Sequence, residues 1–203
     1  MSTLASMDRP APPRPALRVG PVRTVANGVT VVRTVLAVGL GLVGVATGDL
    51  AVLAVAYAVY WVGDILDGWA ARRLDQETRL GAVLDIVSDR ACTAVLCAGL
   101  VAHVAGVLPV AVVFLLSFMV LDTMLSLAFL CWPLVSPNEF HLVDYHVWRL
   151  NWSPPAKAVN TAAVVLAVVV GLPVLAVGIA VAVLGVKVYS AGRVLALLER
   201  DCR

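Results

Sequence analysis

Long apolar segments separated by short polar connections dominate the pattern of this chain. The apolar runs predict six helices, at about residues 29–46, 51–71, 80–105, 108–132, 156–170 and 174–198. A helix rises 1.5 Å per residue, so most of these runs can cross a bilayer core of roughly 30 Å. The pattern therefore predicts an all-α integral membrane protein with six transmembrane helices.

Composition supports a membrane protein and adds an N-terminal tail. Of the 203 residues, 61% are hydrophobic and 14% are charged, whereas soluble domains are about 45–50% apolar. Residues 1–20 are rich in Pro, Arg and Ala and lack the short apolar region of a signal peptide. We expect residues 1–20 to be a disordered cytoplasmic tail, and residues 21–203 to form one membrane domain that opens with a juxtamembrane segment.

The positions of the basic residues predict the orientation of the chain. The connections at 47–50, 102–108 and 171–173 contain no Lys or Arg. The basic residues lie toward the other side of the predicted membrane: Arg9, Arg14, Arg18, Arg23, Arg72, Arg73, Arg79, Arg149, Lys157, Lys187, Arg193, Arg200 and Arg203. Because cytoplasmic loops are enriched in Lys and Arg, we expect a multi-pass protein of the cell membrane with both termini in the cytoplasm.

Cysteine and histidine residues suggest no separate site. Cys92, Cys97, Cys131 and Cys202 show no C-x-x-C spacing, and they are expected to be reduced packing residues. His103 is expected near the outer face. His141 and His146 lie in the polar stretch 136–155, where their spacing fits no standard metal site. No basic run interleaved with aromatic residues indicates nucleic acid.

Four aspartates occupy helical positions on two consecutive predicted spans. Asp64 and Asp67 are three residues apart, and Gly81, Asp85 and Asp89 follow one another at intervals of four. Each set therefore shares one helix face. The short connection between the two spans makes them antiparallel neighbours, so the two acidic faces can converge at the cytoplasmic boundary of the membrane.

Such a concentration of carboxylates requires counter-charge. Ionised groups at membrane depth are costly, and like charges repel. Arg72 and Arg90 are too few to neutralise them, whereas one or two Mg²⁺ or Mn²⁺ ions, which prefer oxygen ligands, would do so. Gly68 and Gly81 would let a bulky ligand approach the backbone. The alternative is that the acids are ordinary solvated residues at helix ends.

Residues 64–89 resemble the signature of the class I CDP-alcohol phosphatidyltransferases, D-x2-D-G-x2-A-R-x8-G-x3-D-x3-D, at every defined position. Asn27, Thr30 and Arg33 are similar to the N-x-x-T-x-x-R that often opens the first span of that family. The resemblance covers about residues 20–198. It implies an enzyme of phospholipid biosynthesis that uses two divalent ions to transfer a phosphatidyl group from CDP-diacylglycerol to an alcohol, with release of CMP.

The resemblance also implies roles for individual residues. Asp64, Asp67, Asp85 and Asp89 would hold the metal ions, and Asp89 would be the general base. The CDP-lipid would contact another set of residues, namely Thr30, Gly68, Ala71, Arg72 and Gly81. Family members are commonly homodimers, so a homodimer is expected.

Acceptor residues are less marked. Lys157, Asn160 and Thr161 resemble the K-x-x-T segment of phosphatidylglycerophosphate synthases and the K-V-N-T segment of eukaryotic-type cardiolipin synthases. Lys157 would bind an acceptor phosphate. Arg33 is a second candidate, or it reaches the interface by snorkelling. Asp122, an acid inside the fourth span, would bind a polyol or pair with Arg33 or a neighbouring helix.

These features favour glycerol 3-phosphate as the acceptor, with phosphatidylglycerol and inositol phosphate as alternatives. Among other classes, intramembrane prenyltransferases need more spans and lack the second-glycine spacing. A cation-binding transporter would place its acids near the bilayer midplane on broken helices, whereas these acids lie toward one face.

Overall fold

The computed structural model describes residues 19–201, and within this range every regular element is a helix. The expected tail, residues 1–20, lies almost wholly outside the described residues, as do Cys202 and Arg203. The longer helices are α1 (Val25–Thr47), α2 (Leu50–Arg73), α3 (Arg79–His103) and α9 (Pro173–Asp201). Cys92, Cys97 and Cys131 are free thiols.

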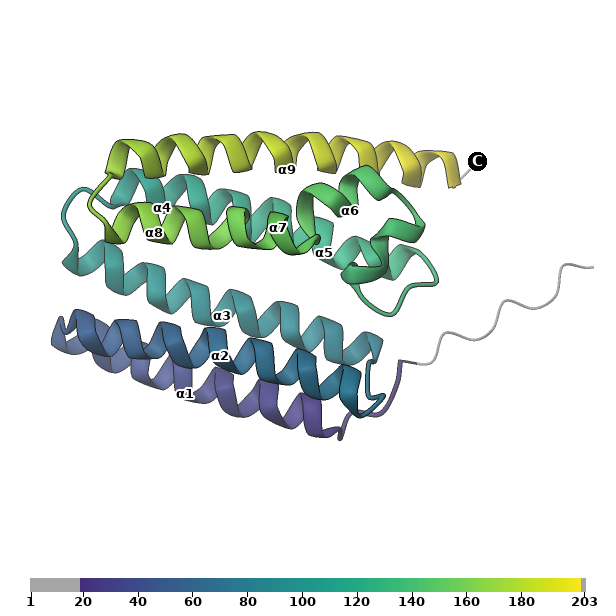
Figure 1. Ribbon diagram of the computed structural model, residues 1–203, viewed down its shortest axis with the longest axis horizontal. Coiled ribbons are helices and arrows are strands. Elements are labelled where there is room, and N and C mark those ends of the chain that lie inside the picture. The colour runs from purple at the N-terminus through teal and green to yellow at the C-terminus, as the bar shows by residue number, and fades with distance from the viewer. Residues whose placement is uncertain (1–18, 202–203) are drawn as a thin grey trace, which may run out of the picture.

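Helices α1, α2 and α3 pack together as one group along the lower side of the molecule (Figure 1). Each begins at a side chain that accepts a backbone N–H: Thr24 from Asn27, Asp49 from Ala51 and Val52, and Thr78 from Gly81. Such caps satisfy N–H groups that have no partner inside the helix. Helix α1 ends at Gly48, whose φ of 71° favours glycine, and the chain turns directly into α2.

A second group contains α9 and two interrupted helices, which lie side by side in Figure 1. The first runs through α4 (Leu108–Leu115), the π-helical segment η1 (Leu116–Asp122), α5 (Thr123–Leu127) and the 3-10 turn η2 (Ala128–Cys131). The second runs through α7 (Pro154–Lys157), the π-helical segment η4 (Ala158–Ala162) and α8 (Ala163–Val169). π-Helical turns inside helices are frequent at functional sites.

The polar stretch between these helices is folded, which the sequence did not predict. It forms η3 (Pro137–Leu142) and α6 (Tyr145–Asn151). Phe140 and Val147 are fully buried, and they pack with Phe129 and Trp152 in the largest described core cluster. Burial of these apolar side chains against Ala191 and Val194 of α9 stabilises the folded segment.

Four of the six predicted spans are confirmed by length and apolar composition: α1, α2, the helix Leu108–Cys131 and Pro173–Arg200. The other two remain predictions. Helix α3 is 25 residues long, but its first half includes Arg79, Asp85, Asp89 and Arg90. The apolar helix Pro154–Val169 is shorter than the four candidate spans.

Asp144 links the folded polar stretch, which contains η3 and α6, to α9 through Arg193. One carboxylate oxygen accepts the N–H of Val147 at 3.0 Å, and the other accepts Arg193 Nη2 at 2.6 Å. Burial opposes ionisation of this carboxyl, but the hydrogen bonds from Val147 and Arg193 hold its pKa below the ordinary value. We predict that Asp144→Asn lowers the stability at neutral pH by about 1–2 kcal/mol, because the charge-assisted contact to Arg193 is lost while the amide oxygen still caps α6.

The sign of the pH dependence follows from the depressed pKa. The contribution of Asp144 is present above the unfolded pKa of about 4 and is lost as the pH falls through the folded value. Thermal unfolding in detergent should therefore show a gap between wild type and Asp144→Asn at pH 7 that closes in acid. Exposed Glu199→Gln is the matched control, and a gap unchanged down to pH 2 would contradict this assignment.

Candidate metal and nucleotide site

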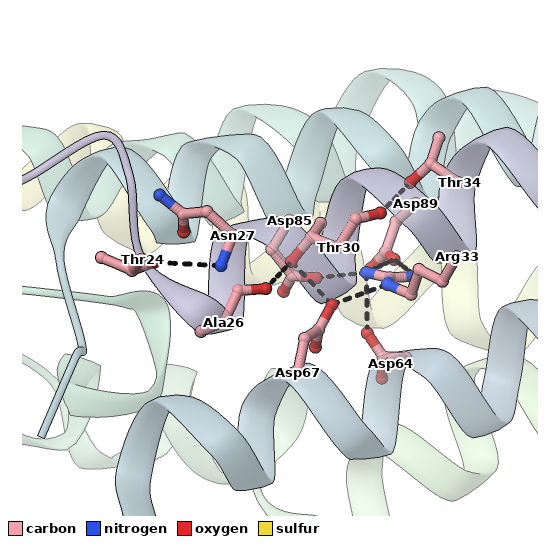
Figure 2. A network of polar contacts seen from close by, with 10 residues as sticks. All are labelled: Thr24, Ala26, Asn27, Thr30, Arg33, Thr34, Asp64, Asp67, Asp85 and Asp89. Carbon is pink, nitrogen blue, oxygen red and sulfur yellow. Dashed lines mark hydrogen bonds and ion pairs between the residues drawn. The ribbon is translucent and has the colours of Figure 1, made fainter. Parts of the chain in front are cut away.

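The four aspartates of the sequence motif converge between α1, α2 and α3 (Figure 2). Asp64 and Asp67 come from α2, and Asp85 and Asp89 come from α3. Oxygen atoms of Asp64, Asp67 and Asp85 all lie within 4.8 Å of one another. Three carboxylates at this separation form an all-oxygen donor set that fits a hard divalent cation such as Mg²⁺ or Mn²⁺.

Arg33 of α1 contacts all four carboxylates. Its Nε donates to Asp67 at 2.7 Å, and its Nη2 lies 2.5 Å from Asp85, 3.2 Å from Asp89 and 3.3 Å from Asp64. The arginine is 3% exposed. Arg33 therefore does not snorkel toward an interface. It also does not line the cavity that opens beside the aspartates.

Asp67 differs from the other three acids in its surroundings. Its side chain is 6% exposed, against 40% for Asp64, 42% for Asp85 and 23% for Asp89. Its Oδ2 accepts both Thr30 Oγ1 at 2.8 Å and Arg33 Nε at 2.7 Å. Two donors on one oxygen fix the orientation of this carboxylate, as groups behind a metal ligand commonly do.

A cavity of about 750 Å³ opens between the two helix groups beside the aspartates. All four aspartates line it, together with the residues that the resemblance associates with a CDP-lipid: Thr30, Gly68, Ala71, Arg72 and Gly81. Its opposite wall includes Asp122, Lys157 and Lys187. The structure thus brings the predicted donor-binding and acceptor-binding residues to one space, with Arg33 behind the aspartates.

The two motif glycines serve different purposes in this structure. A Cβ at Gly81 would lie 2.9 Å from both Asn27 Oδ1 and Thr78 Oγ1, so glycine permits the close approach of these groups. A Cβ at Gly68 would meet only the guanidinium of Arg72, at 3.3 Å. Gly81 is therefore needed for packing, whereas Gly68 leaves room on the cavity wall.

Asp122 pairs with a neighbouring helix on each side and not with Arg33. Arg90 Nη2 donates to it at 2.6 Å from α3, and Lys187 Nζ donates to it from α9. Arg90 also donates to Thr123 at 2.7 Å and lies over the ring of Phe118. Pairing of Asp122 with a neighbouring helix was one of the alternatives expected from the sequence, but its two partners, Arg90 and Lys187, were not identified there. Lys187 could have indicated such a pair from the sequence, because it lies within an apolar helix and a buried ammonium requires a partner.

Lys157 lies at the end of α7 and reaches the folded connection. Its Nζ donates to Asn138 Oδ1 of η3 at 2.9 Å. His141 packs edge-on against Trp148. Within residues 19–201, the only group of His, Cys, Asp or Glu side chains close enough to hold an ion is Asp64, Asp67 and Asp85, so the histidines form no metal cluster there.

Comparison with known proteins assigns the family. The family model described as CDP-alcohol phosphatidyltransferase matches residues 23–191. The chain belongs to this family. It is an enzyme family, and this member combines the family signature with membrane helices and an aspartate cluster suited to divalent ions.

One curated relative adds a short similarity. CDP-diacylglycerol–inositol 3-phosphatidyltransferase of Schizosaccharomyces pombe is 58% identical over 33 residues, which are 16% of this chain and 14% of that protein. No solved structure matches the chain. The branch of the CDP-alcohol phosphatidyltransferase family to which the chain belongs remains a prediction.

We predict that Asp85→Asn weakens Mn²⁺ binding at least tenfold, because an anionic oxygen is lost from the ligand cluster. Electron paramagnetic resonance of free Mn²⁺ in the presence of the purified protein would measure this. Asp75→Asn removes the same charge from the exposed turn after α2 and should leave the affinity unchanged. Equal Mn²⁺ affinity in Asp85→Asn and wild type would refute the site.

Proposed function

We propose that the protein transfers a phosphatidyl group from CDP-diacylglycerol to glycerol 3-phosphate and releases CMP. The observation that supports this most is the convergence, on one cavity, of the complete family signature and a basic opposite wall. The aspartates would face the nucleotide diphosphate, and the basic wall would face an anionic acceptor. In the membrane, this end of the molecule and both termini would face the cytoplasm, as the distribution of Lys and Arg favours.

In this proposal, Asp64, Asp67, Asp85 and Asp89 hold two Mg²⁺ or Mn²⁺ ions. When bound, such ions neutralise the charge of a diphosphate and stabilise the charge that develops on the transferred phosphoryl group. Thr30 and Arg33 keep Asp67 oriented. Gly68, Ala71, Arg72 and Gly81 border the space for the nucleotide.

Asp89 is proposed as the general base. It is more exposed than Asp67 and lines the cavity, so an acceptor hydroxyl can reach its carboxylate. The hydroxyl gives its proton to Asp89 as its oxygen forms a bond to the β-phosphorus of CDP-diacylglycerol. The bond from that phosphorus to the bridging oxygen breaks, and CMP leaves with this oxygen.

The opposite wall supports an acceptor that carries a phosphate. Lys157 would bind the phosphate, with its ammonium already oriented by Asn138. Arg90, Asp122 and Lys187 together carry one net positive charge. Asp122 would fix the two cations and is proposed to act on the acceptor through them.

Inositol, or an inositol phosphate, is the second candidate acceptor, because the relative from Schizosaccharomyces pombe that matches over 33 residues is named for inositol. Phosphatidylglycerol is a further alternative within the same chemistry. A homodimer, which the resemblance implies, is also part of the proposal. A cation transporter would instead move ions without consuming CDP-diacylglycerol.

An acceptor panel tests the proposal directly. Purified protein in detergent with labelled CDP-diacylglycerol should release CMP only when Mg²⁺ or Mn²⁺ and an acceptor are present. We expect glycerol 3-phosphate to give the highest kcat/KM among glycerol 3-phosphate, inositol, inositol phosphate and phosphatidylglycerol. A different preferred acceptor would replace the proposed one, and cation transport without CMP release would refute the enzyme.

We predict that Lys157→Ala raises KM for a phosphorylated acceptor about tenfold or more, because a charge-assisted contact to the phosphate is removed. KM for CDP-diacylglycerol should change little. Arg149→Ala, at an exposed position of α6 outside the cavity lining, is the control. An unchanged acceptor KM in Lys157→Ala would remove Lys157 from the acceptor site.

A further inference from the structure

Arg33 is held among the aspartates by packing of its stem as well as by charge. A Cβ at Gly63 of α2 would lie 2.5 Å from Arg33 Cβ and 2.7 Å from its Cδ. Because Gly63 has no side chain, the aliphatic stem of Arg33 can pack against the backbone of α2. The guanidinium also lies 5.5 Å from the centre of the Tyr60 ring, a favourable position for a cation.

The guanidinium occupies the point where the aspartate oxygens meet. Its Nη2 contacts Oδ1 of Asp64, Asp85 and Asp89, at 3.3, 2.5 and 3.2 Å. Asp64 and Asp85 are also two of the three residues whose oxygens lie close enough together to hold an ion. A divalent ion bound by these acids would therefore share carboxylates with Arg33 and lie close to its guanidinium.

We propose that Arg33 is a built-in counter-cation that competes with the divalent ion for Asp64 and Asp85. Its single charge reduces the net charge of the four carboxylates from four negative to three. The protein thus folds without leaving the acids wholly unpaired, at the cost of weaker metal binding. Arg33 is a positioning residue in this scheme, and it acts on the reaction only through the carboxylates. The inference rests on the metal site of the proposed function.

Competition predicts an increase in metal affinity when the charge of Arg33 is removed. Arg33→Gln should bind Mn²⁺ about tenfold more tightly than wild type, because four carboxylates then attract the ion without an opposing charge. A residue that only oriented the ligands would give the opposite sign, since losing such a group weakens metal binding. The direction of the change therefore separates the two roles.

The same variant should be less stable when metal is withheld. In EDTA, Arg33→Gln leaves four neighbouring carboxylates without their common partner, and its Tm should fall by several degrees. Saturating Mn²⁺ should restore most of this loss, so the Tm increase on adding Mn²⁺ should be larger than in wild type. Arg33→Lys keeps the charge and is expected to lie between wild type and Arg33→Gln in Mn²⁺ affinity.

The experiment is Mn²⁺ titration by electron paramagnetic resonance, with thermal unfolding in parallel, on full-length protein in detergent. Arg79→Gln removes the same charge from a residue that contacts the backbone carbonyls of Leu130 and Trp132, and it should bind Mn²⁺ as wild type does. Equal or weaker binding in Arg33→Gln would overturn the competition, and if that variant does not fold, equal or weaker binding in Arg33→Met, which removes the charge but keeps a long stem beside Gly63, would do so. Wild type that binds no Mn²⁺ would refute the metal site itself.

Discussion

The architecture around the site depends on how four carboxylates are accommodated between apolar helices. Ionised acids in such surroundings are costly unless they are paired. Here, one guanidinium from α1 reaches two acids on α2 and two on α3. The contact is possible because Gly63 leaves space for the arginine stem. The three helices are thereby held in the register that gathers the four carboxylates at one point.

A second group of charges connects this helix group to the rest of the molecule. Arg90 follows Asp89 on α3 but points to Asp122 at the end of η1, which also binds Lys187 of α9. On α3, Asp85 and Asp89 therefore face α1, whereas Arg90 faces the second group of helices. The cavity lies between these two sets of ion pairs. Charged side chains that stabilise the packing are also those that give the cavity its polar walls.

Helix positions and the acidic motif could be predicted from sequence because both depend on local periodicity. Asp64 and Asp67, one helical turn apart, and Asp85 and Asp89, one turn apart, require only that their segments be helical. The fold of residues 136–153 could not be predicted, because it depends on Phe140 and Val147 packing against distant helices. The place of Arg33 was also not predicted. Whether Arg33 reaches the interface or is buried depends on the residue of another helix that lies opposite it. That residue is Gly63, which leaves room for the arginine stem.

The same distinction explains why the proposed donor-binding residues are easier to recognise in the sequence than the proposed acceptor-binding residues. The proposed donor side consists mainly of residues from α2 and α3, which a short turn joins, so its residues form one continuous sequence motif. The proposed acceptor wall consists of residues from η1, α7 and α9, and its paired residues Asp122 and Lys187 are 65 residues apart. A charge on that wall can serve an acceptor or a neighbouring helix, and Asp122 is engaged with two helices. Under the proposed function, the acceptor is therefore selected by the cations of this wall, and Asn138 orients one of them, Lys157, through its Nζ.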